Sequence, residues 1–520
     1  MHTMPLLTAT ERALAARIES ITLANPFSAE RVELEADTLG SAYIPIGPVK
    51  TFEVGAGPNP NTPLLAEQVA TALHALRHRA AQPSAPTPDA ADREAAGHLA
   101  MFALYHAFME RLFTLAETAE AGTVEVAWYP EFQAAVEREV HLGGVQLVAE
   151  VDPARLLALF FQMARAFLNV FAHYVGRTPA AARLRASMWE SIFTHNLGRY
   201  RRALGKSASP LVDVPTLITG PSGTGKELVA RAVGRSGYVP LEERPGRKPR
   251  FVLEPERWFL PVHLASLSPA LIESELFGHR RGAFTGALED RASFLEACAP
   301  YGAVFLDELG EIDAALQVKL LRVLQTREFR RLGGSEPHRF EGRLVSATNR
   351  DLTAELEAGR FREDLYFRLN ADRIETPALA ELLAGDPAEL EHLVGFAARR
   401  VLPGGAAADD PERAAFTAEL CAWIEAELGL DHPWPGNFRE LEQCARAFLV
   451  RGSYRPERRR PAADGLEALL ASVRSGDLTA DALLTAYCRH VHAQVGTYEG
   501  TARRLGLDRR TIKSRVTRDV

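Results

Sequence analysis

The chain has 520 residues, of which 47% are hydrophobic and 24% are charged, so it is neither a disordered nor a collagen-like chain. Its length predicts several domains, each with its own core. Because 60 basic residues stand against 67 acidic ones, any surface that binds nucleic acid must be local.

The sequence favours a cytoplasmic protein that does not span a membrane. The four cysteines are too far apart for a disulfide framework or a CxxC metal site, so reduced thiols are expected. The start of the chain lacks a basic stretch followed by an apolar core, so we expect no secretory signal. The most membrane-like run, residues 156–176, is interrupted by Gln162 and Arg165, which predicts a buried helix of a bundle.

Residues 1–180 are predicted to be an N-terminal regulatory or sensor domain of unknown type that is mostly helical. Apolar residues recur at helical intervals over 98–117. Residues 81–92, rich in Pro and Ala, are expected to be an exposed loop, and the β-branched residues and glycines of 32–56 favour a few strands. From its position alone, we expect this region to sense a ligand or a partner protein.

The pattern changes near residue 185 to short apolar runs followed by helical segments, which predicts an α/β domain with a parallel sheet over 185–377. Strands are expected at 215–219, 303–306 and 343–347. Helical sequence then returns over 378–450. Residues 451–465 are rich in Arg, Pro and Gly and are expected to be a linker before a small helical domain at 466–520.

The most specific motif is GPSGTGKE, which follows the apolar run TLIT and precedes a helical segment. A strand, a glycine-rich loop and a helix in this order predict a loop that binds the phosphates of ATP. Lys226 would neutralise the β- and γ-phosphates, while Glu227 stands where Ser or Thr usually meets Mg²⁺. The predicted nucleotide-binding residues of the loop are Gly220, Pro221, Ser222, Gly223, Thr224, Gly225, Lys226 and Glu227.

Two acids end the next predicted strand, AVFLDE. Since ligands bind at the carboxyl ends of the strands in such sheets, Asp307 and Glu308 are expected beside the nucleotide. Asp307 would hold Mg²⁺ through water, and Glu308 would polarise the attacking water. Asn349 follows the third strand and is suited to orient that water or to sense the γ-phosphate.

Three arginines are further candidates for the nucleotide site. Arg362 and Arg368 lie six residues apart in GRFREDLYFRLN, and an arginine supplied by a neighbouring subunit can accelerate hydrolysis. Arg439 begins a predicted helix after a Pro-Gly turn and would reach the nucleotide from the helical segment.

Taken together, these motifs resemble the central AAA+ ATPase of the bacterial enhancer-binding proteins, the activators of sigma-54 RNA polymerase. The likeness covers about residues 210–450 and includes ESELFGHRRGAFTGA, VFLDELGEI, VSATNRDL and PWPGNFRELE. It implies an AAA+ parallel sheet with a helical lid, ATP and Mg²⁺ as cofactors, and a hexameric ring. It also implies that Arg362 and Arg368 act in trans and that Arg439 is the second sensor.

The GAFTGA segment is nearly diagnostic of this family. Two glycines bracket Phe284 and Thr285, which suits a mobile loop with an aromatic tip. The resemblance implies that this loop contacts sigma-54 and that ATP hydrolysis moves it to remodel the closed promoter complex. The implied contact residues are Gly282, Ala283, Phe284, Thr285, Gly286 and Ala287.

The chain departs from the family pattern at several places. Pro221 stands where the family usually has Glu, and residues 238–267 are longer than expected. His263 occupies the place of an asparagine that couples the catalytic glutamate to the nucleotide. After Pro377, the sequence ALAELLAGDPAEL replaces the usual Pro- and Arg-rich junction to the lid, so hydrolysis and loop movement could be coupled unusually.

The end of the chain is predicted to be a Fis-like helix-turn-helix that binds upstream enhancer DNA. Over 496–520, seven basic residues against three acidic ones give a local charge of +4. Ala502 and Leu505 form an apolar face, Gly506 marks the turn, and Asp508 is a predicted N-cap. The candidate DNA contacts are Arg509, Arg510, Thr511, Lys513 and Ser514.

Two other functions compete with an ATP-dependent activator of sigma-54 RNA polymerase. One is an AAA+ remodelling ATPase of another type, which the intact loop and the basic tail disfavour. The other is a DNA-binding regulator with weak ATPase activity, which the complete set of nucleotide-site residues disfavours but His263 keeps open.

Overall fold

The structure is a computed structural model that describes residues 6–45, 59–142, 145–146, 152–173, 176–204, 211–402, 410–456, 473 and 478–517. It divides into two compact units, Met1–Val450 and Arg451–Val520, which are described separately below. The predicted domain boundaries stay predictions.

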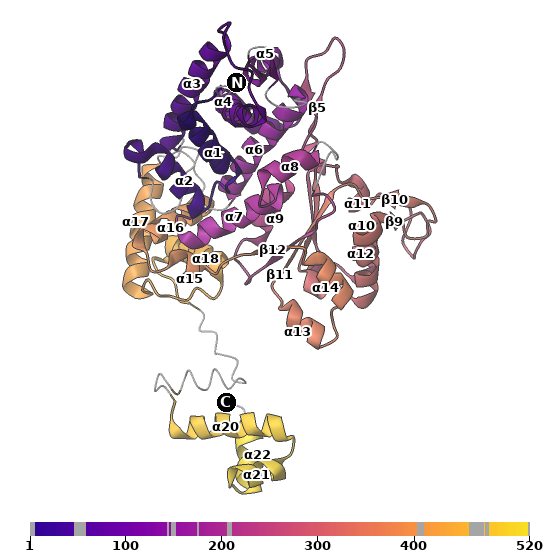
Figure 1. Cartoon of the computed structure of the whole chain (residues 1–520). Helices are drawn as coiled ribbons and strands as arrows, with labels where there is room; N and C mark the ends of the chain where they lie inside the picture. Colours follow the sequence, from indigo (N-terminus) through magenta and orange to yellow (C-terminus); the bar gives the residue numbers. More distant parts are fainter. Residues whose placement is uncertain are drawn as a thin grey trace. The chain divides into compact units, whose positions relative to one another are not determined.

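The N-terminal part of the first unit is mostly helical, as predicted (Figure 1). Its helices and short strands are α1 (Ala9–Leu23), α2 (Ala29–Leu39), η1 (Gly40–Ala42), α3 (Asn61–Ala80), α4 (Ala90–Thr118), η2 (Ala119–Ala121), β1 (Val124–Glu125), α5 (Tyr129–Val140), β2 (His141–Leu142), β3 (Val145–Gln146) and α6 (Pro153–His173).

The strands expected within 32–56 are wrong where the structure describes that segment. Residues 32–39 belong to helix α2, and residues 46–56 lie outside the described residues. The Ser28 side chain accepts a hydrogen bond from the backbone N–H of Arg31 and caps the helix. The Arg31 Nε atom then lies 2.7 Å from Glu35 Oε1, an i,i+4 ion pair, so the cap and this pair outweigh the few β-branched residues.

Helices α4 and α6 form the centre of the N-terminal bundle. Helix α6 is long and apolar enough to cross a membrane by length and composition, but 72% of its most apolar window is buried inside the protein, as expected for a bundle helix. The predicted loop at 81–92 is shorter than expected, because α4 begins at Ala90 and Asp92 is buried. The Asp92 carboxylate accepts hydrogen bonds from Leu6 N and Arg12, which fastens the start of the chain to the bundle.

The central domain contains a five-stranded parallel sheet in the order β12-β4-β11-β8-β7. Strands β4, β8 and β11 confirm the three predicted strands. The strands of this sheet are β4 (Thr216–Thr219), β7 (Phe259–His263), β8 (Ala303–Asp307), β11 (Arg343–Thr348) and β12 (Asp372–Glu375).

Helices cover both faces of the sheet, so its strands are apolar on both sides. Strand β8 illustrates the alternation. Val304 and Leu306 pack in one core with α10 (Pro269–Phe277), α12 (Ala314–Thr326) and α14 (Glu363–Leu369), whereas Phe305 between them stacks on Phe259. The flanking elements are α7 (Pro179–Phe193), α8 (Leu197–Leu204), α9 (Lys226–Gly234), α10 (Pro269–Phe277), α11 (Phe294–Ala297), α12 (Ala314–Thr326), α13 (Leu352–Glu357) and α14 (Glu363–Leu369). The remaining short elements are β5 (Leu241–Glu242), β6 (Arg250–Phe251), η3 (Pro255–Arg257), η4 (Leu264–Ser266), η5 (Leu309–Glu311), β9 (Glu328–Arg330) and β10 (Pro337–Arg339).

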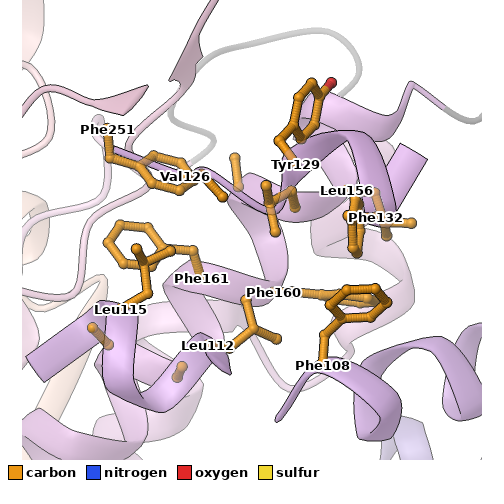
Figure 2. Packing of buried hydrophobic residues seen from close by; sticks show 14 of the residues in the cluster. Phe108, Leu112, Leu115, Val126, Tyr129, Phe132, Leu156, Phe160, Phe161 and Phe251 are labelled. Carbon is orange, nitrogen blue, oxygen red and sulfur yellow. The ribbon is translucent and has the colours of Figure 1, made fainter. Parts of the chain in front are cut away.

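The unexpectedly long segment 238–267 packs against the N-terminal helices. Strand β1 pairs with β6, and β6 pairs with β5, so one small sheet joins the two regions. The rings of Phe161 and Phe251 stack on each other (Figure 2), and their centroids are 4.0 Å apart. Helices α4, α5 and α6 therefore share a single hydrophobic core with this segment.

A helical lid follows the sheet, as predicted for 378–450. Its helices are α15 (Leu379–Leu383), α16 (Pro387–Val401), α17 (Pro411–Glu427) and α18 (Asn437–Arg451). All four cysteines of the chain are free and buried, which agrees with the absence of a disulfide framework.

The described residues of the second unit include the helices α20 (Ala480–Val495), α21 (Tyr498–Leu505) and α22 (Arg509–Thr517). Gly506 ends α21 with a φ of 66°, and Asp508 Oδ1 accepts hydrogen bonds from Arg510 N and Thr511 N at the start of α22. Ala502, Ile512 and Cys488 are buried together. The predicted turn and N-cap are confirmed, whereas most of the predicted linker lies outside the described residues.

Candidate nucleotide site

The glycine-rich loop joins the end of β4 to the start of α9. Gly220, Gly223 and Gly225 have φ angles of 146°, 80° and 86°, a region that favours glycine. A Cβ atom on Gly223 would lie 2.4 Å from the carbonyl oxygen of Gly436, so the lid backbone also requires a glycine there. The buried Thr224 hydroxyl lies 2.7 Å from Thr376 Oγ1 and fastens the loop to the end of β12.

Lys226 is the first residue of α9 and lies within reach of the other charged candidates. Its Nζ atom donates hydrogen bonds to Gly220 O at 2.9 Å and Pro221 O at 2.8 Å. Burial lowers the pKa of Lys226, the nearby Arg439 lowers it further, and Asp307 and Glu308 oppose that change. The structure thus brings together these four predicted residues at the carboxyl edge of the sheet.

Asp307 and Glu308 lie at the end of β8, half-buried, as the strand prediction required. Glu308 has a left-handed conformation with φ at 58°, a strained state for a non-glycine residue that is typical of functional sites. His263 Nδ1 lies 3.4 Å from Asp307 Oδ2 and pairs in register with Asp307 across β7 and β8. The histidine therefore contacts the first acid of the pair, Asp307.

The start of α18 in the lid contacts the phosphate-binding loop directly. Asn437 Nδ2 donates to Ser222 O at 2.9 Å, and Phe438 N donates to Gly223 O at 3.0 Å. Arg439 Nη1 donates to Ser222 Oγ at 3.0 Å, which brings this predicted residue to the loop. The sequence reasoning missed Asn437, although an Asn after Pro-Gly at a helix start is a signal for a left-handed residue, and its φ is 52°.

Asn437 also binds the first helix of the lid. Its Oδ1 atom accepts a hydrogen bond from Leu379 N at 2.8 Å, at the start of α15. Because the side chain is 98% buried, these bonds are shielded from water. One amide thus links the phosphate-binding loop to both ends of the lid.

The remaining predicted residues of the site lie at the end of β11 and on α14. Asn349 is exposed and follows β11, the strand between β4 and β8. Arg362 and Arg368 lie at the start and near the end of α14: Arg362 forms a two-bond ion pair with Asp364, and Arg368 donates to Leu324 O. The ion pair raises the pKa of Arg362, and both arginines are exposed.

The loop fits the phosphates of a nucleotide, because its glycines leave no room for side chains and a helix N-terminus follows it. Asp307 offers the oxygen ligands that Mg²⁺ prefers, while Glu227 is paired with Arg231 at 3.0 Å. Among the described residues, no group of three or more His, Cys, Asp or Glu side chains could hold a metal.

The GAFTGA segment forms a tight turn in the sheet domain. Ala287 N donates to Phe284 O and Gly282 N donates to Ala287 O, which leaves Thr285 and Gly286 at the tip. Gly286 has a φ of 103°, as a turn of this kind requires. Phe284 is 40% exposed, and its ring lies 5.0 Å from that of the buried His279.

A cavity of about 550 Å³ opens elsewhere, between α16 and α17. Arg177, Arg399 and Arg413 line it together with His392. Burial and the surrounding arginines lower the pKa of His392 to about 4, so this histidine is neutral near pH 7. The lining residues come from the lid and the segment before α7, so the cavity is distinct from the phosphate-binding loop.

In the second unit, the candidate DNA contacts share the exposed part of α22. Arg509, Arg510, Lys513 and Ser514 are exposed, whereas the Thr511 hydroxyl donates to Asp508 Oδ2 at 2.5 Å. Thr511 thus has a capping role in the structure.

Residues 199–375 match a family described as the sigma-54 interaction domain. The chain is 43% identical over 228 residues to the Nif-specific regulatory protein of Azotobacter vinelandii, covering 44% of this chain and 38% of that protein. It is 35% identical over 317 residues to the transcriptional regulatory protein ZraR of Salmonella typhimurium, covering 59% of this chain and 64% of that one. The chain thus spans less than two thirds of the length of either relative.

Among solved structures, the chain is similar to NtrX from Brucella abortus in complex with ATP. The two are 24% identical, the match covers 71% of this chain and 76% of that one, and the TM-score is 0.36.

Proposed function

We propose that the chain is a sigma-54-dependent transcriptional activator, a family whose sigma-54 interaction domain is an AAA+ ATPase, and that it uses ATP hydrolysis to activate sigma-54 RNA polymerase. The observation that carries the proposal is one domain that holds both a phosphate-binding loop with paired acids and the exposed turn at Gly282–Ala287. In this proposal, ATP hydrolysis at the phosphate-binding loop moves the turn at Gly282–Ala287 against sigma-54. This movement remodels the closed promoter complex.

In this proposal, each residue around Lys226 has a role in binding or hydrolysing ATP. The loop backbone and Lys226 would bind the phosphates, and Asp307 would hold Mg²⁺. Glu308 polarises the attacking water, while Asn349 orients it. The magnesium ion, when bound, supplies the charge that offsets the phosphates.

A second copy of the chain completes the site in this proposal. Arg362 and Arg368 are exposed and are available to a neighbouring subunit, and Arg439 reports the lid position. A ring of identical subunits would bring these arginines to the nucleotide of the neighbouring subunit. By family resemblance this ring is a hexamer, and the protein acts in the cytoplasm. The N-terminal helices then receive the signal, a ligand or a partner protein.

The direct test is complex formation with sigma-54. Full-length protein, purified sigma-54 and ADP with aluminium fluoride, which mimics the transition state of hydrolysis, should elute together from a size-exclusion column. The same mixture without nucleotide should elute separately. Failure to form a joint complex, with nucleotide binding verified in the same sample, would refute the sigma-54 assignment.

The basic face of α22 supports the proposal that the second unit binds enhancer DNA as a helix-turn-helix. Exposed cations on the second of two short helices fit the phosphates that flank a major groove.

We predict that Lys513→Gln weakens DNA binding and flattens its salt dependence. Loss of one phosphate contact should lower the slope of log K against log salt by about 1. Fluorescence anisotropy with a fixed duplex between low and moderate salt would measure this slope. Lys248→Gln, which removes an exposed lysine of the first unit, serves as the control and should leave the slope unchanged. An unaltered slope in Lys513→Gln would exclude that contact.

A further inference from the structure

Helix α6 of the N-terminal region binds the far end of the helix that starts at the phosphate-binding loop. Gln162 Nε2 donates to Ser236 O at 2.9 Å, and Asn169 Nδ2 donates to Ser236 Oγ at 3.2 Å. Between them, the Arg165 guanidinium donates to Gly237 O at 3.1 Å and also to Arg235 O. The three side chains are spaced by three and four residues, so they share one face of α6, and all are at least 96% buried.

These donors bind the carbonyls of Arg235, Ser236 and Gly237, the three residues that directly follow α9 (Lys226–Gly234). The last carbonyls of a helix lack partners within the helix, and a cation there also interacts favourably with the helix dipole. Helix α9 has nine residues and begins with Lys226, so its two ends are about 13 Å apart along a rigid element. The position of its carboxyl end therefore constrains the position of Lys226 and the loop.

The long segment 238–267 also contacts Arg165, through the ring of Trp258. The Arg165 guanidinium lies 4.6 Å from the ring centroid of Trp258, and Arg235 lies 4.9 Å from the same ring. Trp258 is fully buried, and the neighbouring Phe251 stacks on Phe161 of α6 (Figure 2). Burial lowers the pKa of Arg165 to about 10, so the group is still charged near neutral pH.

We propose that Gln162, Arg165 and Asn169 are positioning residues of the nucleotide site, which act through α9 and let the N-terminal domain set the affinity for ATP. This proposal rests on the proposed nucleotide site at Gly220–Lys226. In this proposal, the long segment 238–267 transmits the position of the N-terminal helices to the ATPase domain, because both pack in one hydrophobic core. It also means that the N-terminal region is part of the nucleotide site's support rather than a detachable module.

The test compares full-length Arg165→Met with the wild-type protein. Methionine keeps the apolar stem of Arg165 but removes the donors to the end of α9. The dissociation constant for ATP should rise about tenfold, a usual size for coupling between sites, while kcat at saturating ATP stays within about twofold. Arg165→Lys, which keeps a charge and a donor, should recover most of the affinity.

The control is Arg12→Met, which removes a different arginine of the N-terminal bundle, one that pairs with Asp92 at 2.7 Å. It should lower the unfolding temperature without changing the dissociation constant for ATP. Asn169→Ala is the milder second variant if Arg165→Met does not fold, and it should raise the constant about threefold. Wild-type affinity in both folded variants would overturn the proposal, whereas no ATP binding by the wild-type protein would refute the nucleotide site itself.

Discussion

Glu308→Gln is expected to bind ATP normally and to hydrolyse it at least about 100-fold more slowly than the wild-type protein. Glutamine keeps the size and the hydrogen-bonding oxygen of the side chain but loses the negative charge that polarises the attacking water. Positioned acid–base groups contribute about 10²–10⁴-fold to rates. The left-handed backbone of Glu308 at the end of β8 holds this side chain beside Asp307 and Lys226, so another acid cannot easily replace it.

Two measurements separate binding from turnover in this variant. Titration with a fluorescent ATP analogue gives the affinity, and single-turnover hydrolysis gives the chemical rate. The control, Glu311→Gln, removes a nearby acid of η5 that pairs with Arg350, and it should turn over ATP within about twofold of the wild-type rate. Wild-type hydrolysis by Glu308→Gln would remove Glu308 from the catalytic assignment.

Much of the ATPase domain could be predicted because its signals are local in the sequence. The loop at Gly220–Lys226 carries its strand, its glycines and its helix within about twenty residues, and β8 ends directly in its two acids. The parallel arrangement of strands then brings distant acids to the loop without any further signal. For the same reason, the capped turn before α22 could be predicted from Gly506 and Asp508.

The parts that could not be predicted depend on contacts between distant segments. Residues 32–39 form a helix because its cap and an ion pair stabilise it, and β propensity is too weak to decide such a segment. The link of Asn437 to Ser222 and Leu379 joins residues more than 50 positions apart. The pairing of β1 with β6 likewise joins segments more than 100 residues apart, so the packing of the long segment 238–267 could not be predicted from the sequence.

The contact between His279 and Phe284 bears on how the GAFTGA turn is presented. His279 is buried, and Ser274 Oγ lies 2.8 Å from its Nδ1 atom, so its ring is fixed in place. The Phe284 ring leans on that fixed surface, while Thr285 at the tip is exposed. An aromatic anchored at its base and an exposed hydroxyl at the tip suit a turn that offers both to a partner.

Thr285→Ala should therefore stop the formation of open promoter complexes while ATP turnover stays within about twofold of the wild-type rate. Because the hydroxyl is exposed at the tip of the turn and is no part of the nucleotide site, its loss affects only the proposed partner interface, and open complexes should fall at least about tenfold. Permanganate footprinting on a sigma-54 promoter measures opening, and phosphate release measures turnover. Thr353→Ala, which truncates an exposed threonine on α13 of the same domain, should leave both rates unchanged. Continued promoter opening by Thr285→Ala would show that the Thr285 hydroxyl is not needed for the proposed contact with sigma-54.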